Sequence, residues 1–352
     1  MKPVIICGGI GSKMWPMSRS TMPKHFLPLI NGKSLFELNW EALRKRFIPE
    51  EIFLQTNEVQ AKIAKNIVPE IIEENIFIEP EMRNQGPATG FAAAQLIKKG
   101  FGDEPFILVQ ADVLRESDED FLAMIREVEK LAKSNDKYIT GGFTPEIIIR
   151  GVDYLVKGNL ITEENGVKIF EVADYVDRTE EEKIKQYLGT DKLLLHANHT
   201  TMTPNNLLKM YQKYKMEWYE PLMAIANGGD IVTEYGKMLK AGIEEVTKLV
   251  YKNNEALVVE LPFNWVDFGT WESVANYMKE KDFYQTDSET LEIESNNNYI
   301  YKKDKKFIAI IGVEDLVIVD TGDALLIMKK DQSGKVGQVV DKLKEDDRNE
   351  LL

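Results

Sequence analysis

Cysteine and histidine are scarce in this sequence, which has one cysteine, Cys7, and three histidines among 352 residues. A lone cysteine excludes a disulfide bond within the chain. No group of cysteines and histidines has the spacing of a structural zinc site. We therefore expect neither a disulfide-stapled nor a zinc-stabilised fold, and the lack of disulfides favours the cytoplasm as the compartment.

Long apolar runs are missing as well. No window approaches the roughly 18 uninterrupted apolar residues that a membrane-spanning helix needs. The first apolar run, residues 4–7, is too short for the centre of a secretory leader and ends at two glycines. We therefore expect no membrane partner and no leader.

Positive charge is in deficit, because 44 lysines and arginines face 58 aspartates and glutamates, which gives a net charge of −14. Affinity for nucleic acid comes largely from neutralising phosphates, so we expect no nucleic-acid partner. A small phosphorylated ligand is not excluded, because the local field matters more than the net charge for such a ligand. Hydrophobic residues make up 43% of the chain, enough for one large core or two unequal ones.

The first 112 residues alternate between short apolar runs and amphipathic segments. The expected strands are residues 4–7, 51–56, 75–79 and 106–110, and the expected helices are residues 34–46, 58–68 and 88–99. Ser34 and Glu37 have the spacing of a capping box at the first of these helices. Strands separated by helices indicate parallel crossovers, so the pattern predicts an α/β sheet covered on both faces.

The middle of the chain is less regular and predicts a continuation of the same sheet as a mixed sheet. Its expected strands are residues 138–143, 154–156, 167–176 and 256–260, and its expected helices are residues 180–187 and 205–218. After Met278, five short apolar runs begin at residues 290, 298, 307, 316 and 324. This spacing leaves no room for helices and predicts the coils of a β-solenoid or a small β-roll, closed by a helix over residues 335–344.

Three glycines, Gly8, Gly9 and Gly11, directly follow the first expected strand, and Lys13, Arg19 and Lys24 come soon after. Glycines at such a place allow close approach of a ligand, and their N–H groups can bind phosphate oxygens. The spacing is neither that of a dinucleotide fingerprint nor that of a P-loop. A tight turn with solvated lysines is therefore an open alternative, although the two prolines in this segment favour a preorganised anion site.

The segment GGIGSKMWPMSRSTMPKHFL, residues 8–27, resembles the signature of sugar-1-phosphate nucleotidyltransferases, and in particular their mannose-1-phosphate guanylyltransferase branch. Four later segments resemble family motifs in the same order, namely EPEMRNQGPATG, LVQAD, FNWVDFGTWESV and VEDLVIVDTGDALLIMKK. The resemblance spans nearly the whole chain. It implies a Rossmann-like, mostly parallel (mixed) nucleotidyltransferase domain over residues 1–280 and a left-handed β-helix-like domain over residues 281–352.

The resemblance also implies roles for individual residues. It implies catalytic roles for Lys13 and Lys24, nucleotide binding by Gly8, Gly9, Gly11, Ser12, Asn84, Pro87 and Ala88, sugar binding by Gly151, Asp177 and Arg178, and metal binding by Asp112 and Asp267. Mg²⁺ is the implied cofactor, GTP and a hexose 1-phosphate are the implied partners, and a homodimer stays open. Taken alone, Asp112 could instead be a helix cap or turn residue, and Asp267 a loop aspartate beside aromatic side chains.

The implied reaction joins two anions, so positioned cations, backbone N–H groups and a divalent metal are the groups that it needs. The nucleotide and metal motifs are better preserved than the sugar motifs. Lys13 stands where the family has a catalytic arginine, and lysine lacks the planar fork that grips two phosphate oxygens. The family motif F-x-E-K-P is replaced by YVDRT, and G-Y-G-Y by GVDY.

Three functions therefore stay open. The first is guanylyl transfer to mannose 1-phosphate or another hexose 1-phosphate. The second is a non-catalytic paralogue that binds a nucleotide or sugar nucleotide as a regulator or complex partner. The third is a transferase with another nucleotide specificity.

Overall fold

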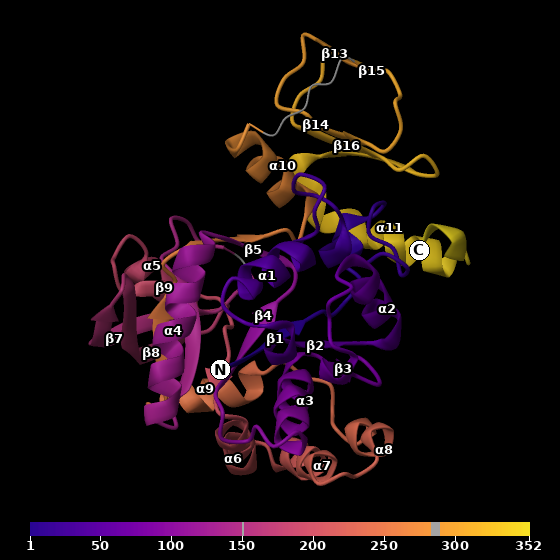
Figure 1. Ribbon diagram of the computed structural model, residues 1–352. Coiled ribbons are helices and arrows are strands. Elements are labelled where there is room, and N and C mark those ends of the chain that lie inside the picture. Colours follow the sequence, from indigo (N-terminus) through magenta and orange to yellow (C-terminus); the bar gives the residue numbers. More distant parts are fainter. Residues whose placement is uncertain (150, 283–288) are drawn as a thin grey trace. The chain divides into compact units, whose positions relative to one another are not determined.

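A ten-stranded mixed sheet lies at the centre of the first of two units into which the chain folds (Figure 1). The computed structural model describes residues 1–149, 151–282 and 289–352. The sheet unit consists of Met1–Gly8, Asn39–Ala111 and Arg115–Trp265, and the loop unit consists of Gly9–Leu38, Asp112–Leu114 and Val266–Leu352. The expected domain boundary after residue 280 stays a prediction, because residues 283–288 beside it lie outside the described residues.

The strands of the sheet unit follow the order β11-β8-β7-β9-β6-β10-β4-β1-β2-β3, which confirms a mixed sheet. Their bounds are Lys2–Ile6 (β1), Phe53–Thr56 (β2), Ile76–Ile78 (β3), Phe106–Gln110 (β4), Tyr138–Phe143 (β6), Tyr154–Glu164 (β7), Val167–Val176 (β8), Leu193–His196 (β9), Thr201–Met202 (β10) and Ala256–Glu260 (β11). Strand β1 is parallel to both β2 and β4, as the alternating pattern predicts. Strand β7 extends eight residues beyond its expected end at residue 156.

The strand register brings several loops to one edge of this sheet. Strand β10 is antiparallel to both β4 and β6, so β4 and β6 run in the same direction. Phe143, the last residue of β6, lies opposite Leu195, and Leu195 lies opposite Tyr154, the first residue of β7. Tyr154 lies opposite Val176, the last residue of β8. The loops after β4 and β6 therefore leave the sheet at its carboxyl edge, where open α/β sheets bind ligands, and the start of β7 and the end of β8 lie level with the end of β6.

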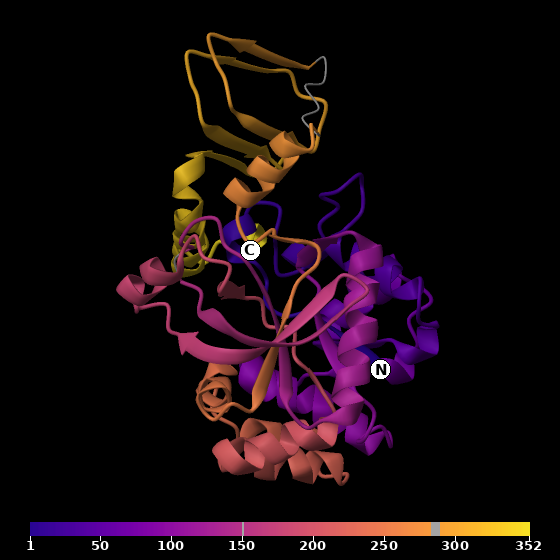
Figure 2. The ribbon, with the colours of Figure 1, turned by 90° about the vertical axis from the view of Figure 1, so that its left-hand side faces the viewer.

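Helices cover this sheet on both faces. Their bounds are Leu35–Arg44 (α1), Glu58–Ile67 (α2), Gln85–Lys98 (α3), Asp118–Ser134 (α4), Glu181–Tyr187 (α5), Pro204–Tyr214 (α6), Met216–Ala226 (α7), Ile231–Gly236 (α8) and Glu244–Lys252 (α9). Helices α3, α6, α7 and α9 share one apolar core with the sheet, and Figure 2 shows α4 across the sheet from α9. No helix within the described ranges is long and apolar enough to cross a bilayer.

Helix boundaries agree with the sequence pattern where a cap is encoded and differ where packing decides. Ser34 Oγ accepts a hydrogen bond from the Glu37 amide (3.2 Å) and the Glu37 carboxylate accepts one from the Ser34 amide (2.8 Å), which confirms the capping box. The expected helix over residues 205–218 was wrong as a single element, because the backbone at Lys215 leaves helical space between α6 and α7. Helix α3 begins three residues earlier than expected, with Asn84 as its cap.

The loop unit holds the glycine-rich segment and the C-terminal strands. Its elements include α10 (Trp271–Glu280), β13 (Thr290–Ile293), β14 (Tyr299–Lys302), β15 (Ile308–Ile311), β16 (Leu316–Asp320), β17 (Leu325–Lys329) and α11 (Val336–Glu345). Strands β13 and β15 pair in parallel, as do β14 and β16, which forms two coils (Figure 1). Strand β17 instead turns back antiparallel to β16. The solenoid is therefore short and ends in a hairpin rather than in a further coil.

An apolar core stabilises the loop unit internally. Met14, Trp15, Trp271 and Val317 are almost fully buried in it. The Trp271 indole donates a hydrogen bond to the Trp15 carbonyl oxygen at 2.8 Å. The glycine-rich segment is therefore attached to α10 rather than free in solvent.

Candidate active site

The glycine-rich segment folds back on itself in the loop unit. Gly9 and Gly11 have φ angles of +74° and +81°, a region that residues with a Cβ rarely adopt. Residues Ser12–Met14 form a short 3₁₀ turn, and the Lys24 amide donates a hydrogen bond to the Ile10 carbonyl oxygen at 3.1 Å. These contacts bring Lys24 next to Gly11, thirteen residues earlier in the chain.

Lys24 joins the two aspartates that the sequence predicts as metal ligands. Its Nζ lies 2.7 Å from Asp112 Oδ2 and 3.8 Å from Asp267 Oδ1. Burial disfavours the charged ammonium, but the two carboxylates outweigh this effect and raise the pKa of Lys24. Burial would raise the pKa of Asp112, but Lys24 outweighs it and lowers that pKa. The three residues therefore form a charged cluster with a net charge of −1.

Within this cluster, Lys24 balances the negative charge of Asp267 less closely than that of Asp112. Asp267 ends strand β12 (Asn264–Asp267), which pairs with β5 (Val113–Glu116) in a separate two-stranded sheet. Asp267 therefore lies outside the ten-stranded sheet. Loss of water around its carboxylate and repulsion by Asp112 raise the pKa of Asp267, although Lys24 and Lys13 lower it.

Two carboxylates that share one ammonium have the donor chemistry of a Mg²⁺ site. Mg²⁺ is usually bound by one or two carboxylates, with waters and substrate phosphates as the other ligands. Among residues 1–149, 151–282 and 289–352, no group of three or more histidine, cysteine, aspartate or glutamate side chains could hold a metal ion. The carboxylates of Asp112 and Asp267 are of the donor type that Mg²⁺ prefers.

Gly11 allows Lys24 to reach the aspartates. An ideal Cβ at Gly11 would lie 2.5 Å from Lys24 Cγ and 2.6 Å from Lys24 Cβ. We expect Gly11→Ala to lower the free energy of unfolding by about 1–2 kcal/mol, because its φ is left-handed. We also expect it to lower turnover about tenfold, because the displaced Lys24 would leave its position between the carboxylates. Denaturant titration and steady-state kinetics measure the two effects separately.

Gly32 provides the matched control for this substitution. It has a φ of +77° in the same unit, and nothing lies within 4 Å of an ideal Cβ there. Gly32→Ala should therefore lose similar stability and keep full turnover. Equal turnover in the two variants would show that the contact between Gly11 and Lys24 is unimportant.

Lys13 and Ser12 occupy the 3₁₀ turn directly after Gly11. Lys13 is exposed, and its charge contributes to lowering the pKa of Asp267. The loop unit thus brings together Gly9, Gly11, Ser12, Lys13, Lys24, Asp112 and Asp267, seven of the fourteen predicted site residues. The other seven belong to the sheet unit.

The predicted nucleotide-binding residues of the sheet unit lie after β1 and at the start of α3. Gly8 follows β1, and Asn84 caps α3 with a φ of +68° and a hydrogen bond from the Gln85 amide to its side chain (2.8 Å). Pro87 and Ala88 are buried in the first turn of α3. Gln55 Nε2 donates a hydrogen bond to the Ala88 carbonyl oxygen at 2.9 Å. Asn84 is therefore the exposed part of this segment.

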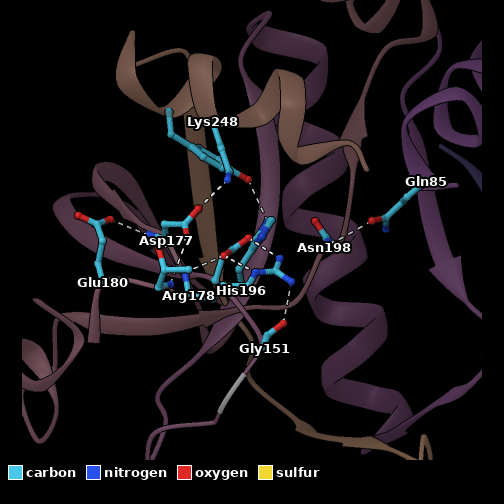
Figure 3. A network of polar contacts seen from close by, with 11 residues as sticks. Gln85, Gly151, Asp177, Arg178, Glu180, His196, Asn198 and Lys248 are labelled. Atoms are coloured by element: carbon cyan, nitrogen blue, oxygen red, sulfur yellow. Dashed lines mark hydrogen bonds and ion pairs between the residues drawn. The ribbon is translucent and has the colours of Figure 1, made fainter. Parts of the chain in front are cut away.

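The predicted sugar-binding residues meet in a network of charged side chains (Figure 3). The Arg178 guanidinium binds both oxygens of Asp153 at 2.9 and 2.7 Å, and it donates to the Gly151 carbonyl oxygen at 2.8 Å. Asp177 Oδ2 lies 2.6 Å from Lys248 Nζ. Our sequence reasoning did not single out Asp153 or Lys248. The aspartate in GVDY, where the family motif has glycine, was the signal for the first of them.

His196 lies beneath this network and is a core residue. Its Nε2 is 3.0 Å from Thr140 Oγ1 and 2.9 Å from the Tyr251 hydroxyl. Burial lowers the pKa of His196 to about 4, so the imidazole is neutral at pH 7. His196 is therefore a neutral, hydrogen-bonded residue of the core.

Two family models match parts of the chain. The model described as nucleotidyl transferase matches residues 2–146, and the model described as MannoseP isomerase/GMP-like beta-helix domain matches residues 288–343. Together they cover the glycine-rich segment, Asp112 and the C-terminal coils.

Known proteins with related sequences cover nearly the whole chain. The mannose-1-phosphate guanylyltransferases of Klebsiella pneumoniae and Escherichia coli are each 29% identical to it over 99% of this chain and 75% of their own length. The crystal structure of mannose-1-phosphate geranyltransferase from Thermus thermophilus matches with a TM-score of 0.82 at 23% sequence identity. The match covers 97% of this chain and 99% of that one, so the two proteins share a fold. The chain is therefore a nucleotidyltransferase, and over nearly its whole length it is similar to the mannose-1-phosphate guanylyltransferases among the sugar-1-phosphate nucleotidyltransferases.

Proposed function

We propose that this protein transfers the guanylyl group of GTP to mannose 1-phosphate or a related hexose 1-phosphate and releases pyrophosphate, with Mg²⁺ as the cofactor. The convergence of Lys24, Asp112 and Asp267 beside the glycine-rich segment is the observation that carries this proposal. The names of the related enzymes support GTP and mannose 1-phosphate as the substrates.

The chain supplies the groups that bring two phosphates together. Bound Mg²⁺, held by Asp112 and Asp267, would supply positive charge to the phosphate oxygens. The N–H groups around Gly9 and Gly11 and the ammonium of Lys13 would bind the triphosphate of GTP. Lys24 would neutralise charge that develops between the reacting phosphates, because it already lies between the two carboxylates. No protein nucleophile is needed, because the sugar phosphate attacks the α-phosphate directly.

GTP should bind at least about tenfold more tightly than ATP, UTP or CTP when Mg²⁺ is present, an affinity ratio worth about 1.4 kcal/mol. Such a preference would come from contacts between the base and the segment around Asn84. Isothermal titration calorimetry with each nucleotide measures it. Asn84→Ala should reduce the preference, while Asn165→Ala, in the turn between β7 and β8, should leave it unchanged.

A pyrophosphate-release assay tests the reaction itself. Release that needs both GTP and mannose 1-phosphate, and that stops when Mg²⁺ is chelated, would support the proposal. Equal affinity for all four nucleotides would contradict the guanylyl assignment. Tight GTP binding without pyrophosphate release for any hexose 1-phosphate would favour a binding role instead.

A further inference from the structure

Asp153 is a buried carboxylate that pairs with Arg178. Only 2% of its side chain is exposed, whereas 44% of the Arg178 side chain is exposed. Asp153 Oδ1 accepts hydrogen bonds from both the backbone amide and Nε of Arg178, each at 2.9 Å, and Oδ2 accepts one from Nη2 at 2.7 Å. Burial opposes the charge of Asp153, but these hydrogen bonds outweigh it and lower its pKa. The pair is therefore charged and held at three points.

These contacts leave part of the guanidinium available. A guanidinium has five N–H donors in one plane. The Asp153 carboxylate accepts the N–H of Nε and one N–H of Nη2. The Gly151 carbonyl oxygen accepts one N–H of Nη1 at 2.8 Å. One donor on each terminal nitrogen is not used in these contacts. Two donors in a fixed plane match two oxygens of a phosphate group.

The neighbouring aspartate does not compete for these donors. Asp177 Oδ1 accepts hydrogen bonds from the amide and hydroxyl of Thr179, at 3.1 and 2.8 Å. Asp177 Oδ2 is paired with Lys248 at 2.6 Å. Figure 3 shows Lys248 and Asp177 facing one another on one side of Arg178, with Gly151 on the other. Lys248 therefore neutralises a carboxylate that would otherwise repel a phosphate near Arg178.

The register of the sheet places this arrangement where ligands bind. Asp153 precedes β7 and Arg178 follows β8, and the first residue of β7 lies opposite the last residue of β8. Phe143 at the end of β6 is level with these residues, so Asp153 and Arg178 lie beside the edge at which β6 ends. Arginine side chains at this edge can reach a ligand bound above the sheet.

We propose that Asp153 is a positioning residue that holds Arg178 in one orientation, so that its two remaining terminal donors bind the phosphate of the sugar 1-phosphate. This inference rests on the proposed function. A fixed guanidinium loses less rotational freedom on binding than a free one, so Asp153 lowers the KM for the sugar phosphate without contacting it. It explains how the chain recognises a phosphate with YVDRT in place of the family motif.

Asp153→Asn tests this role, because asparagine keeps the shape of aspartate but has an NH₂ group in place of one carboxylate oxygen. That NH₂ group would face an arginine N–H group, and two donors cannot form a hydrogen bond with each other. We expect the KM for mannose 1-phosphate to rise about tenfold, while the KM for GTP and kcat at saturation change less than about twofold. Arg178→Lys keeps the charge and loses the fork, so its KM should rise similarly. The double variant should show no further rise, because Asp153 acts only through Arg178.

Asp174→Asn is the matched control, because Asp174 lies on β8, four residues before Arg178, and is paired at 2.7 Å with a different partner, Lys183. Its KM for mannose 1-phosphate should equal that of the parent. Additive rises in the double variant, or a loss of stability in Asp153→Asn without a change in KM, would overturn the proposal. Arg178→Lys keeps the test valid if Asp153→Asn fails to fold, because an unchanged KM there also overturns it.

Calorimetry separates this inference from the proposed function. A parent without pyrophosphate release would contradict the proposed function, and titration of mannose 1-phosphate into the protein without GTP would still test Asp153. Binding that is about tenfold weaker in Asp153→Asn supports the positioning role. Equal affinities, or no binding to the parent, overturn it.

Discussion

Asp112→Asn is expected to lower kcat by about 10²–10³, the effect of removing one positioned electrostatic group from a reaction between phosphates. Asparagine has nearly the same volume, so the fold should be retained. It removes the charge that faces Lys24 at 2.7 Å and one of the two carboxylates available to Mg²⁺. Asp267→Asn should have an effect of similar size, because it removes the second carboxylate. Pyrophosphate release at saturating GTP and mannose 1-phosphate, over a range of Mg²⁺ concentrations, measures both.

The double variant distinguishes a shared site from two independent effects. Residues that act as one unit lose little more together than either loses alone. We therefore expect the variant with both substitutions to be nearly as active as each single variant. Asp136→Asn is the control, because this exposed aspartate precedes β6 and so lies at the edge opposite the carboxyl edge. Parental kcat in Asp112→Asn or Asp267→Asn would rule out the two-aspartate site.

Lys13→Ala is the second substitution for which we expect a large loss, again about 10²–10³ in kcat. Lys13 is an exposed cation at the turn after Gly11, and its charge already reaches Asp267. Lys13→Arg should instead equal or exceed the parent, because a planar guanidinium can hold two phosphate oxygens where an ammonium is a point charge. Single-turnover measurements with bound GTP separate this effect on chemistry from an effect on affinity.

Lys62→Ala, at an exposed position of α2, controls for the loss of one positive charge from the protein. It should leave kcat and the KM for GTP unchanged. If Lys13→Ala changed the KM for GTP alone, Lys13 would bind the ground state and would not stabilise the transition state. A Lys13→Ala variant with parental kinetics would remove Lys13 from the site altogether.

Local patterns in the sequence predicted most elements of the fold. β4, β6, β8 and β11 have the predicted bounds, because each is a short buried run between residues that end strands. The five C-terminal runs each form a strand for the same reason. Helix α4 was missed although its apolar residues repeat at helical spacing, and the break at Lys215 has no strong local signal. Packing against the sheet decides such elements.

The candidate site shows the same division between local and distant information. The sequence by itself determined which residue types are present, namely the glycines, Lys13, Lys24 and the two aspartates, because their motifs are contiguous. Only the tertiary structure placed Lys24 between Asp112 and Asp267, which lie 88 and 243 residues after it in the chain. It also placed Asp153 against Arg178, 25 residues later. Ion pairs between distant residues depend on how strands and loops are brought together, and a single sequence carries no local signal for that arrangement.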